Sequence, residues 1–297
     1  MLRLFVSSVI TLIVLASPVL ADTFGDHWYD GKGELDGYAL RINRYGETRD
    51  GTAVMIFVTE PFRESTRVKA DDPSRNAGDV FSALKLNLVR DFQTGIYDYN
   101  TMVSVFSRDD DFTVSKVSFS SAEWCGHVYQ EMNFHDRTVE GVYHSYFEGE
   151  SGPVSLERPE DGVSEDNLFI LLRDLRGTFL NPGEKRTVPF LPSPFYTRIS
   201  HTDMAWTKAV IERSKDTQNV TVPAGPYEAR VYTVRVDGGR TGTFHIEDAY
   251  PHRIVKWSLD PDVSGELTGS LRVPYWRLHD NRHQGYLEQL GLSGPAQ

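Results

Sequence analysis

Apolar and polar residues alternate with a period of two along most of this chain, which is the pattern of half-buried β-strands. Near the start, Tyr38, Leu40 and Ile42 share one face, while Arg41 and Asn43 share the other. The run 53–59 instead is apolar at nearly every position and is typical of a central strand covered on both faces. We therefore expect a mainly β protein.

The same reasoning predicts strands through both halves of the sequence. Short polar links join them, which favours antiparallel meanders over βαβ units. Turn-forming residues predict a connection at 45–51, and Val222-Pro223-Ala224-Gly225 predicts a tight turn. The expected strands are 38–43, 53–59, 84–88, 97–105, 112–120, 123–134, 139–148, 204–213, 226–236, 241–247, 253–259 and 265–273.

Helical spacing is found in two short segments. Ser164 is a good capping residue and Gly177 a good stop for a helix between them. A second short helix is expected over Tyr286–Leu290. The apolar face of the first helix consists of Leu168, Leu171, Leu172 and Leu175.

A polar, proline-containing stretch at 149–165 predicts the domain organisation. We expect an N-terminal β-rich lobe at 22–150, a linker with the amphipathic helix at 151–195, and a C-terminal β-rich lobe at 196–297. The alternative is a single continuous sheet that curls around the helix.

The first 21 residues predict export. Arg3 precedes an apolar run at 4–16, and Val19 and Ala21 occupy the −3 and −1 places of a signal-peptidase site. The run is too short to be a good membrane anchor. We therefore expect cleavage after Ala21 and a periplasmic protein that does not span the membrane.

The net charge limits which classes of binding partner are expected, and the cysteine content excludes an internal disulfide. The formal net charge is −11, and no cluster of Lys or Arg stands out. Nucleic acids and anionic membrane surfaces bind clustered cations, so neither is an expected partner. Cys125 is the single cysteine, so no intramolecular disulfide can form and stability must come from packing.

One constellation of polar residues follows from pairing the strands on either side of Asp136-Arg137. If they form a hairpin, residues whose numbers sum to 273 lie opposite each other. This register separates an apolar face from a polar face, whereas a slip by one residue would mix the two. The apolar face would hold Trp124, Val128, Met132, Phe134, Val139, Tyr143 and Phe147, and the polar face Glu123, Cys125, His127, Tyr129, Glu131, Asn133, Glu140, His144, Tyr146 and Glu148.

The polar face allows three interpretations. Cys125, His127, His144 and Glu148 are suitable ligands for zinc or a similar divalent metal, with the first three as the core set. Alternatively, His127 lowers the pKa of Cys125 and makes it a nucleophile, as in a thiol-dependent hydrolase. The third interpretation is a solvated sheet face with an inert cysteine and no cofactor.

Other motifs of catalysis are absent. The chain has no HExxH, no paired CxxC, no GxSxG and no phosphate-binding glycine loop. His201 lies in a proline-flanked loop, and we interpret it as an ordinary polar loop residue. His279 and His283 are four residues apart near the C-terminus and read as a solvated face.

Several segments resemble an uncharacterised family of exported bacterial β-sheet proteins, a domain of unknown function. Such chains are often labelled septum formation inhibitor Maf, but the Ser-x-Ser-Pro-Arg-Arg loop of Maf proteins is absent. This resemblance rests on Trp28, Gly31–Leu35, Arg44–Glu47, Ile56–Glu60, Lys85–Asn87, Thr94–Tyr97, Glu123–His127 and His144–Glu148. The second half resembles a periplasmic β-sheet domain of unknown function at Val222–Gly225 and Tyr250–Lys256. The resemblance of the second half implies an open, curved, barrel-like sheet with a concave apolar face.

These observations favour binding over catalysis. The leading hypothesis is a periplasmic module that binds an apolar or amphiphilic ligand, or an envelope protein, on a curved sheet face. The alternatives are a metalloprotein or hydrolase that uses the Cys125 face, and a structural partner in the envelope with an exposed apolar patch.

Overall fold

Strands dominate the computed structural model, which describes residues 22–259 and 263–292. Within these residues, sixteen strands form one large sheet, antiparallel except at its last pair. The expected signal peptide at 1–21 lies outside the described residues. The sheet order is β8-β7-β6-β5-β4-β3-β2-β1-β16-β15-β14-β13-β11-β10-β9, with β12 paired to β13.

The first half is a meander of eight strands, each paired with the next along the chain. The link between the first two is shorter than the expected connection at 45–51, because Tyr45 and Gly46 both adopt positive φ and form a two-residue hairpin turn. These strands are β1 (Gly33–Arg44), β2 (Glu47–Arg63), β3 (Val80–Thr94), β4 (Tyr97–Arg108), β5 (Val114–Glu123), β6 (Gly126–Phe134), β7 (Thr138–Ser145) and β8 (Gly152–Glu157).

The second half supplies the other eight strands. The predicted turn is confirmed, since Val222 pairs with Gly225 across Pro223-Ala224. The strands are β9 (Val163–Ser164), β10 (Lys185–Leu191), β11 (Thr207–Arg213), β12 (Gln218–Val222), β13 (Gly225–Val236), β14 (Thr241–Glu247), β15 (Ile254–Leu259) and β16 (Val263–Val273).

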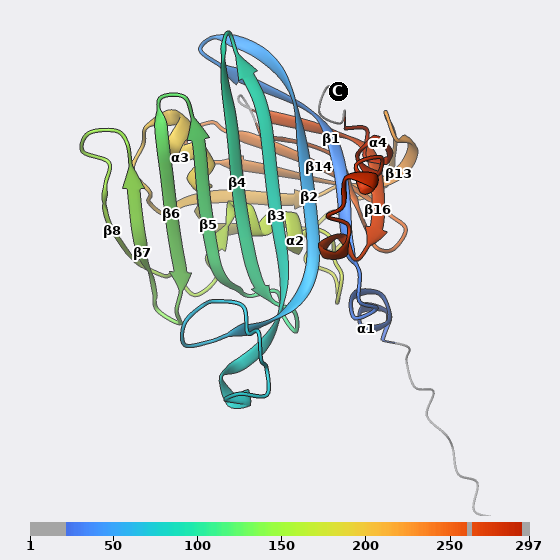
Figure 1. The fold of residues 1–297 in the computed structure, drawn as a ribbon, viewed down its shortest axis with the longest axis horizontal. Helices are drawn as coiled ribbons and strands as arrows, with labels where there is room; N and C mark the ends of the chain where they lie inside the picture. The colour runs from blue at the N-terminus through green and yellow to red at the C-terminus, as the bar shows by residue number, and fades with distance from the viewer. Residues whose placement is uncertain (1–21, 260–262, 293–297) are drawn as a thin grey trace, which may run out of the picture.

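The two expected lobes are parts of a single sheet. The first strand pairs with the last, from Gly33 opposite Val273 to Ile42 opposite Val263. This pairing satisfies the backbone groups that two separate sheets would leave along exposed edges. The alternative expectation, one sheet curling around the helix, describes the fold: β2 to β7 form one wall, β13 and β14 run behind it, and α2 (Leu168–Leu171) lies between (Figure 1). The sheet remains open between β8 and β9.

Residues 151–195 are not an exposed linker. They hold β8, β9, β10 and α2, and they end in the first turn of α3 (Pro194–Ser200). The predicted helix is shorter than expected, because its first residues form a 3₁₀ turn, η2 (Glu165–Asn167), and the α-helix itself covers only Leu168–Leu171. The remaining helical segments are α1 (Thr23–Trp28), η1 (Ala77–Asp79), η3 (Tyr275–Arg277), η4 (Asn281–His283) and α4 (Tyr286–Gln289).

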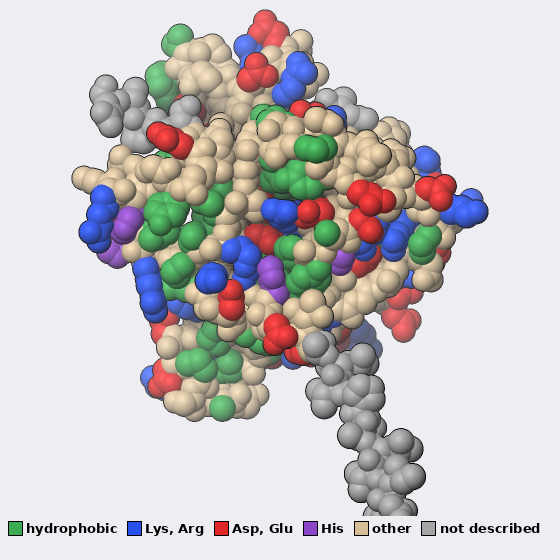
Figure 2. All heavy atoms as spheres, turned by 90° about the vertical axis from the view of Figure 1, so that its right-hand side faces the viewer, with side chains coloured by type: hydrophobic (Ala, Val, Ile, Leu, Met, Phe, Trp, Pro, Cys, Tyr) green, Lys and Arg blue, Asp and Glu red, His purple; other side chains and the backbone are tan. Residues whose placement is uncertain are grey.

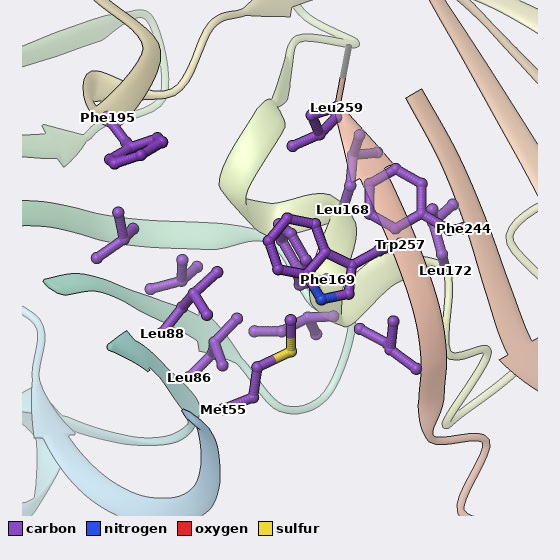
Figure 3. Close-up of a cluster of buried hydrophobic side chains, with 14 of the residues drawn as sticks. Met55, Leu86, Leu88, Leu168, Phe169, Leu172, Phe195, Phe244, Trp257 and Leu259 are labelled. Atoms are coloured by element: carbon purple, nitrogen blue, oxygen red, sulfur yellow. The ribbon is translucent and has the colours of Figure 1, made fainter. Parts of the chain in front are cut away.

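The concave face of the sheet is filled by protein. Phe169 of α2 makes edge-to-face contacts with Phe244 and Trp257, at centroid distances of 5.3 and 5.5 Å. Figure 3 shows these rings packed against Met55, Leu86 and Leu88 from the opposite wall, and all of them are buried. Within the described residues, no helix is long and apolar enough to cross a membrane.

Candidate functional site

The hairpin predicted around Asp136-Arg137 is present with the predicted register. Val128 pairs with Ser145, Tyr129 with His144, and Phe134 with Val139, so the paired numbers sum to 273. Val128, Phe134 and Val139 are buried, as expected of the apolar face. The polar face of β6 and β7 therefore points to solvent.

The prediction is wrong where the hairpin meets β5. Trp124 and Cys125 form the two-residue turn between β5 and β6, because Glu123 already pairs with Gly126. Trp124 is 70% exposed instead of joining the apolar face. Glu123 belongs to β5 and points inward, where its carboxylate contacts the guanidinium of Arg198. The alternation that predicted both positions ends at the turn.

The predicted polar cluster is spread over a solvent-exposed face. Cys125 is a free, exposed thiol in the turn, and His127, His144 and Glu148 are exposed as well. Among the described residues, no group of three or more His, Cys, Asp or Glu side chains is placed to hold a metal ion. The zinc and thiol interpretations remain predictions without geometric support.

A buried ion pair lies on the concave face of β1. The Arg173 guanidinium, which follows α2, contacts the Glu34 carboxylate at 2.7 Å and donates hydrogen bonds to the carbonyls of Pro251 and His252. Burial acts to raise the pKa of Glu34, but the charge of Arg173 outweighs it and lowers that pKa. Burial and the neighbouring Glu34 carboxylate raise the pKa of Asp36 to about 8. These contacts tie the segment after α2 to the sheet.

A second group of buried polar residues holds the chain just before α2. Arg240 donates two hydrogen bonds to Glu165, at 2.7 and 3.0 Å, and Ser193 donates to Asp166 at 2.7 Å. Burial and the charge of Glu165 raise the pKa of Asp166 to about 7. Arg90 stacks over the Phe195 ring at 4.2 Å beside this group. The charges inside the sheet thus anchor α2 and α3 rather than line an open cavity.

The C-terminal segment docks on the outer face of β1 and β16 through a pair of glycines. Gly37 and Gly269 lie opposite each other in the two strands. A Cβ atom at Gly37 would lie 2.0 Å from the Leu290 carbonyl oxygen, and one at Gly269 would lie 2.1 Å from that of Gln289. The Thr268 hydroxyl donates a hydrogen bond to the Leu290 carbonyl at 2.5 Å. Only residues without a side chain permit so close an approach.

A hollow of 310 Å³ lies beside this contact. Leu35 and Leu271 form its floor as a directly opposed cross-strand pair, and Leu278 and Leu287 of the C-terminal segment contribute apolar walls. All four leucines are only partly buried, so their side chains are not fully packed. Hydrophobic side chains are visible on this side of the molecule in Figure 2, near the upper centre at the level of the C-terminal segment.

The rim of the hollow is polar. Asn281 and Gln284 are exposed there, and the His283 Nδ1 atom is buried with no hydrogen-bond partner among the described residues. An apolar floor with a polar rim suits a ligand that has an apolar body and a polar head. We refer to this feature as the outer hollow.

A larger hollow of 410 Å³ opens where the chain crosses from β8 to β9. Its lining mixes exposed charges of both signs, including Arg186, Glu160 and Asp161. Apolar side chains, among them Phe112, Leu171 and Phe179, also line it, but charged residues are interspersed among them. The outer hollow is therefore the better candidate for the ligand expected from the sequence.

Comparison with known proteins finds one solved structure with limited similarity. No protein-family model matches the chain, and no curated protein does. One solved structure, a β-barrel-like protein of domain of unknown function DUF1849 from Brucella abortus, aligns with a TM-score of 0.48 and 9% sequence identity. The alignment covers 81% of this chain and 98% of that one. The Maf label and the export of the chain stay predictions.

Sequence reasoning missed the residues of the outer hollow. The signal was present in β1, where Leu35 stands between Glu34 and Asp36. Alternation places that leucine on the face opposite the two acids, and hence opposite Tyr38. What the pattern alone does not reveal is that the acids face inward and the leucine faces outward.

Proposed function

We propose that this chain is an exported, non-catalytic binding protein of the periplasm whose outer hollow receives the apolar part of an amphiphilic ligand. The observation that carries the proposal is the 310 Å³ hollow floored by the opposed Leu35 and Leu271 side chains. Its volume lies at the lower end of the range for small-molecule pockets.

The size of the hollow limits the ligand. A volume of 310 Å³ corresponds to about ten water molecules. A saturated chain of about eight carbons with one polar atom fills a comparable space. A long double-chain lipid would extend beyond the hollow, so the proposal favours a single short chain.

The polar rim sets the position of the head group. The unpartnered His283 Nδ1 atom and the Gln284 side chain offer hydrogen bonds to a hydroxyl or carboxyl group. Burial of the chain against the leucines supplies the affinity, at about 25 cal/mol per Å² of apolar surface removed from water. The concave interior offers no such space because α2 fills it.

Isothermal titration of the protein with 1-octanol tests the proposal. We expect saturable binding at one site, and we expect the Leu287→Asn variant to weaken it at least about tenfold, since it introduces a polar group into the wall. The control is Ile96→Asn, which makes the same type of change at a residue that is 83% exposed in the β3–β4 turn. That variant should bind as the wild type does.

Two results would contradict the proposal. Octanol that fails to saturate a site, or that binds Leu287→Asn as tightly as the wild type, would exclude the outer hollow as its site. Native mass spectrometry of protein isolated gently from its own compartment adds an independent readout. A bound mass that fits a single short-chain amphiphile and that Leu287→Asn lacks is the expected result.

A further inference from the structure

A third cavity, smaller than the two hollows described above at 120 Å³, lies at the open end of the sheet, where β6 and β7 meet the C-terminal end of α3. Gln130 of β6 and Tyr143 of β7 are directly opposed on its sheet side. Glu150, from the segment after β7, and His201, which caps α3, close it from the other side. None of these residues lines the outer hollow.

Gln130 is the unusual member of this lining. Its side chain is 3% exposed, and its amide makes no hydrogen bond with any residue that the structure describes. The Gln130 amide atoms are not among the fully buried atoms that lack a partner, so they face the cavity, where another molecule can complete their hydrogen bonds. The cavity that the amide lines is the place where such a molecule fits.

The Glu150 carboxylate is already satisfied by the protein. It accepts hydrogen bonds from His201 Nδ1 at 2.6 Å, from the Ser145 hydroxyl at 2.6 Å and from the Tyr143 hydroxyl at 3.2 Å. Burial acts to raise the pKa of Glu150, but the hydrogen bonds from Ser145 and His201 outweigh it and lower that pKa. Glu150 therefore carries its negative charge at neutral pH.

The groups that remain free in the cavity are mostly acceptors. The Thr197 hydroxyl donates its proton to the Pro194 carbonyl, and the Thr202 hydroxyl donates to Ser200, whose own proton goes to the Tyr196 carbonyl. The oxygen lone pairs of Thr197 and Thr202 stay available.

Two further groups in the lining are free to accept hydrogen bonds. Tyr143 keeps its oxygen lone pairs, and the Asp203 carboxylate has no ion-pair or hydrogen-bond partner among the described residues. The Gln130 amide is then the only free side-chain donor among the lining residues that the structure describes. A cavity with many acceptors and few donors recognises a ligand that donates hydrogen bonds.

Charge points in the same direction. The nearby Arg198 guanidinium contacts the buried Glu123 carboxylate, so its charge is matched. Glu150 and Asp203 leave the surroundings of the cavity negative. A donor-rich ligand in a negative site is a cation.

We propose that this cavity binds the primary ammonium group of a small amine, held by Gln130, Tyr143, Thr197, Thr202 and Asp203. The acceptors that the protein leaves free are enough to receive all three N–H donors of an ammonium. A volume of 120 Å³ corresponds to about four water molecules, which suits an amine of about four non-hydrogen atoms. The source is either a free small amine or the amino end of a larger molecule that enters the cavity.

Titration of the isotope-labelled full protein with ethanolamine, followed by NMR, tests this proposal. We expect the Gln130 side-chain amide signal, identified by its absence in Gln130→Met, to shift and saturate with a dissociation constant of about 1 mM, as befits so small a ligand. Ethylene glycol has the same number of non-hydrogen atoms but no charge and should bind at least about tenfold more weakly.

Matched variants locate the site. Asp203→Asn should weaken ethanolamine binding at least about fivefold, whereas Asp216→Asn, in an exposed turn, should leave it unchanged. Gln130→Met should abolish binding, whereas Gln284→Met, at the rim of the outer hollow, should not. If Gln130→Met fails to fold, Thr202→Val serves in its place.

Some results of these titrations would overturn the proposal, and others would identify the source of the amine. Equal affinity for ethylene glycol, an affinity that Asp203→Asn leaves unchanged, or an amide signal that does not move would each overturn the proposal and indicate a cavity that holds water only. A phosphorylated ethanolamine that binds as ethanolamine does would assign the site to the amino end of a larger molecule. Weaker binding of the phosphorylated form would assign it to a free amine.

Discussion

The two faces of the sheet at β1 differ in polarity and in packing, and the two properties do not go together in the usual way. The concave face carries Glu34 and Asp36, yet it is packed solid around α2. The outer face carries Leu35, yet it keeps an unfilled hollow beneath the C-terminal segment. An apolar face would ordinarily be buried and a charged face would ordinarily be solvated.

The difference shows that capacity for a ligand depends on what covers a face rather than on its polarity. Inside, Arg173 pairs with Glu34 and Arg240 pairs with Glu165, so the segment from Glu165 to Arg173 is anchored at both ends and its apolar residues fill the space. Outside, the C-terminal segment approaches the sheet closely around Gly37, Gly269 and Thr268 and leaves the nearby leucines partly exposed.

The strongest test of this comparison is the Phe169→Ala variant. Phe169 is 1% exposed and packs against Phe244 and Trp257, so its truncation leaves a cavity that the surrounding strands cannot fill. We expect the free energy of unfolding to fall by about 3–5 kcal/mol, measured by urea denaturation. A loss below about 1 kcal/mol would mean that the interior is loosely packed and is itself able to hold a ligand.

The Gly37→Ala variant tests the outer face alone. Its new methyl group collides with the Leu290 carbonyl, so we expect a loss of about 1–3 kcal/mol and faster hydrogen exchange in 274–292, with 168–172 still protected. Gly152→Ala is the control, because a Cβ atom there meets no atom within 4 Å. Equal exchange in both variants would show that the glycine contact does not hold the C-terminal segment.

The smallest expected effect concerns the charge of Asp36. The folded protein keeps this carboxyl protonated up to about pH 8, whereas the unfolded chain loses the proton near pH 4, so the wild type should lose stability as the pH rises between these values. Asp36→Asn removes that loss, and we expect its stability relative to the wild type to be at least about 1 kcal/mol greater at pH 8 than at pH 5.

Thermal unfolding across this pH range checks the prediction. The control is Asp50→Asn, since the Asp50 side chain is 92% exposed and should give curves parallel to those of the wild type. Parallel curves for Asp36→Asn as well would indicate that Asp36 is ionised inside the sheet and paired with a cation.

Much of the fold was predictable because strand alternation is a local property. The register of β6 and β7 followed from the separation of Val128 and Phe134 from Tyr129, and the β12–β13 turn followed from Pro223 and Gly225. The β5–β6 boundary was misjudged because Trp124 continues the apolar alternation although it lies in a turn. Alternation indicates a face but not where a strand ends.

The candidate sites were hardly predictable. The residues of the outer hollow lie more than two hundred positions apart, at Leu35 and Leu271, and the pairing of the first and last strands brings them together. Gln130 looked like an ordinary strand residue, because nothing near it in sequence reveals that its side chain is buried and lines a cavity. His201 was interpreted as a loop residue, and its partner Glu150 comes from a distant hairpin.

The sequence by itself determined the β class, the antiparallel hairpins and two of the turns, since each depends on residues within a few positions of one another. Only the tertiary structure decided that the two halves form one sheet, that residues 164–175 and α3 fill its interior, and which side of β1 faces inward. These outcomes depend on pairing and burial between segments far apart in the chain, where the free energy comes from surface removed from water and from buried charges that find a partner.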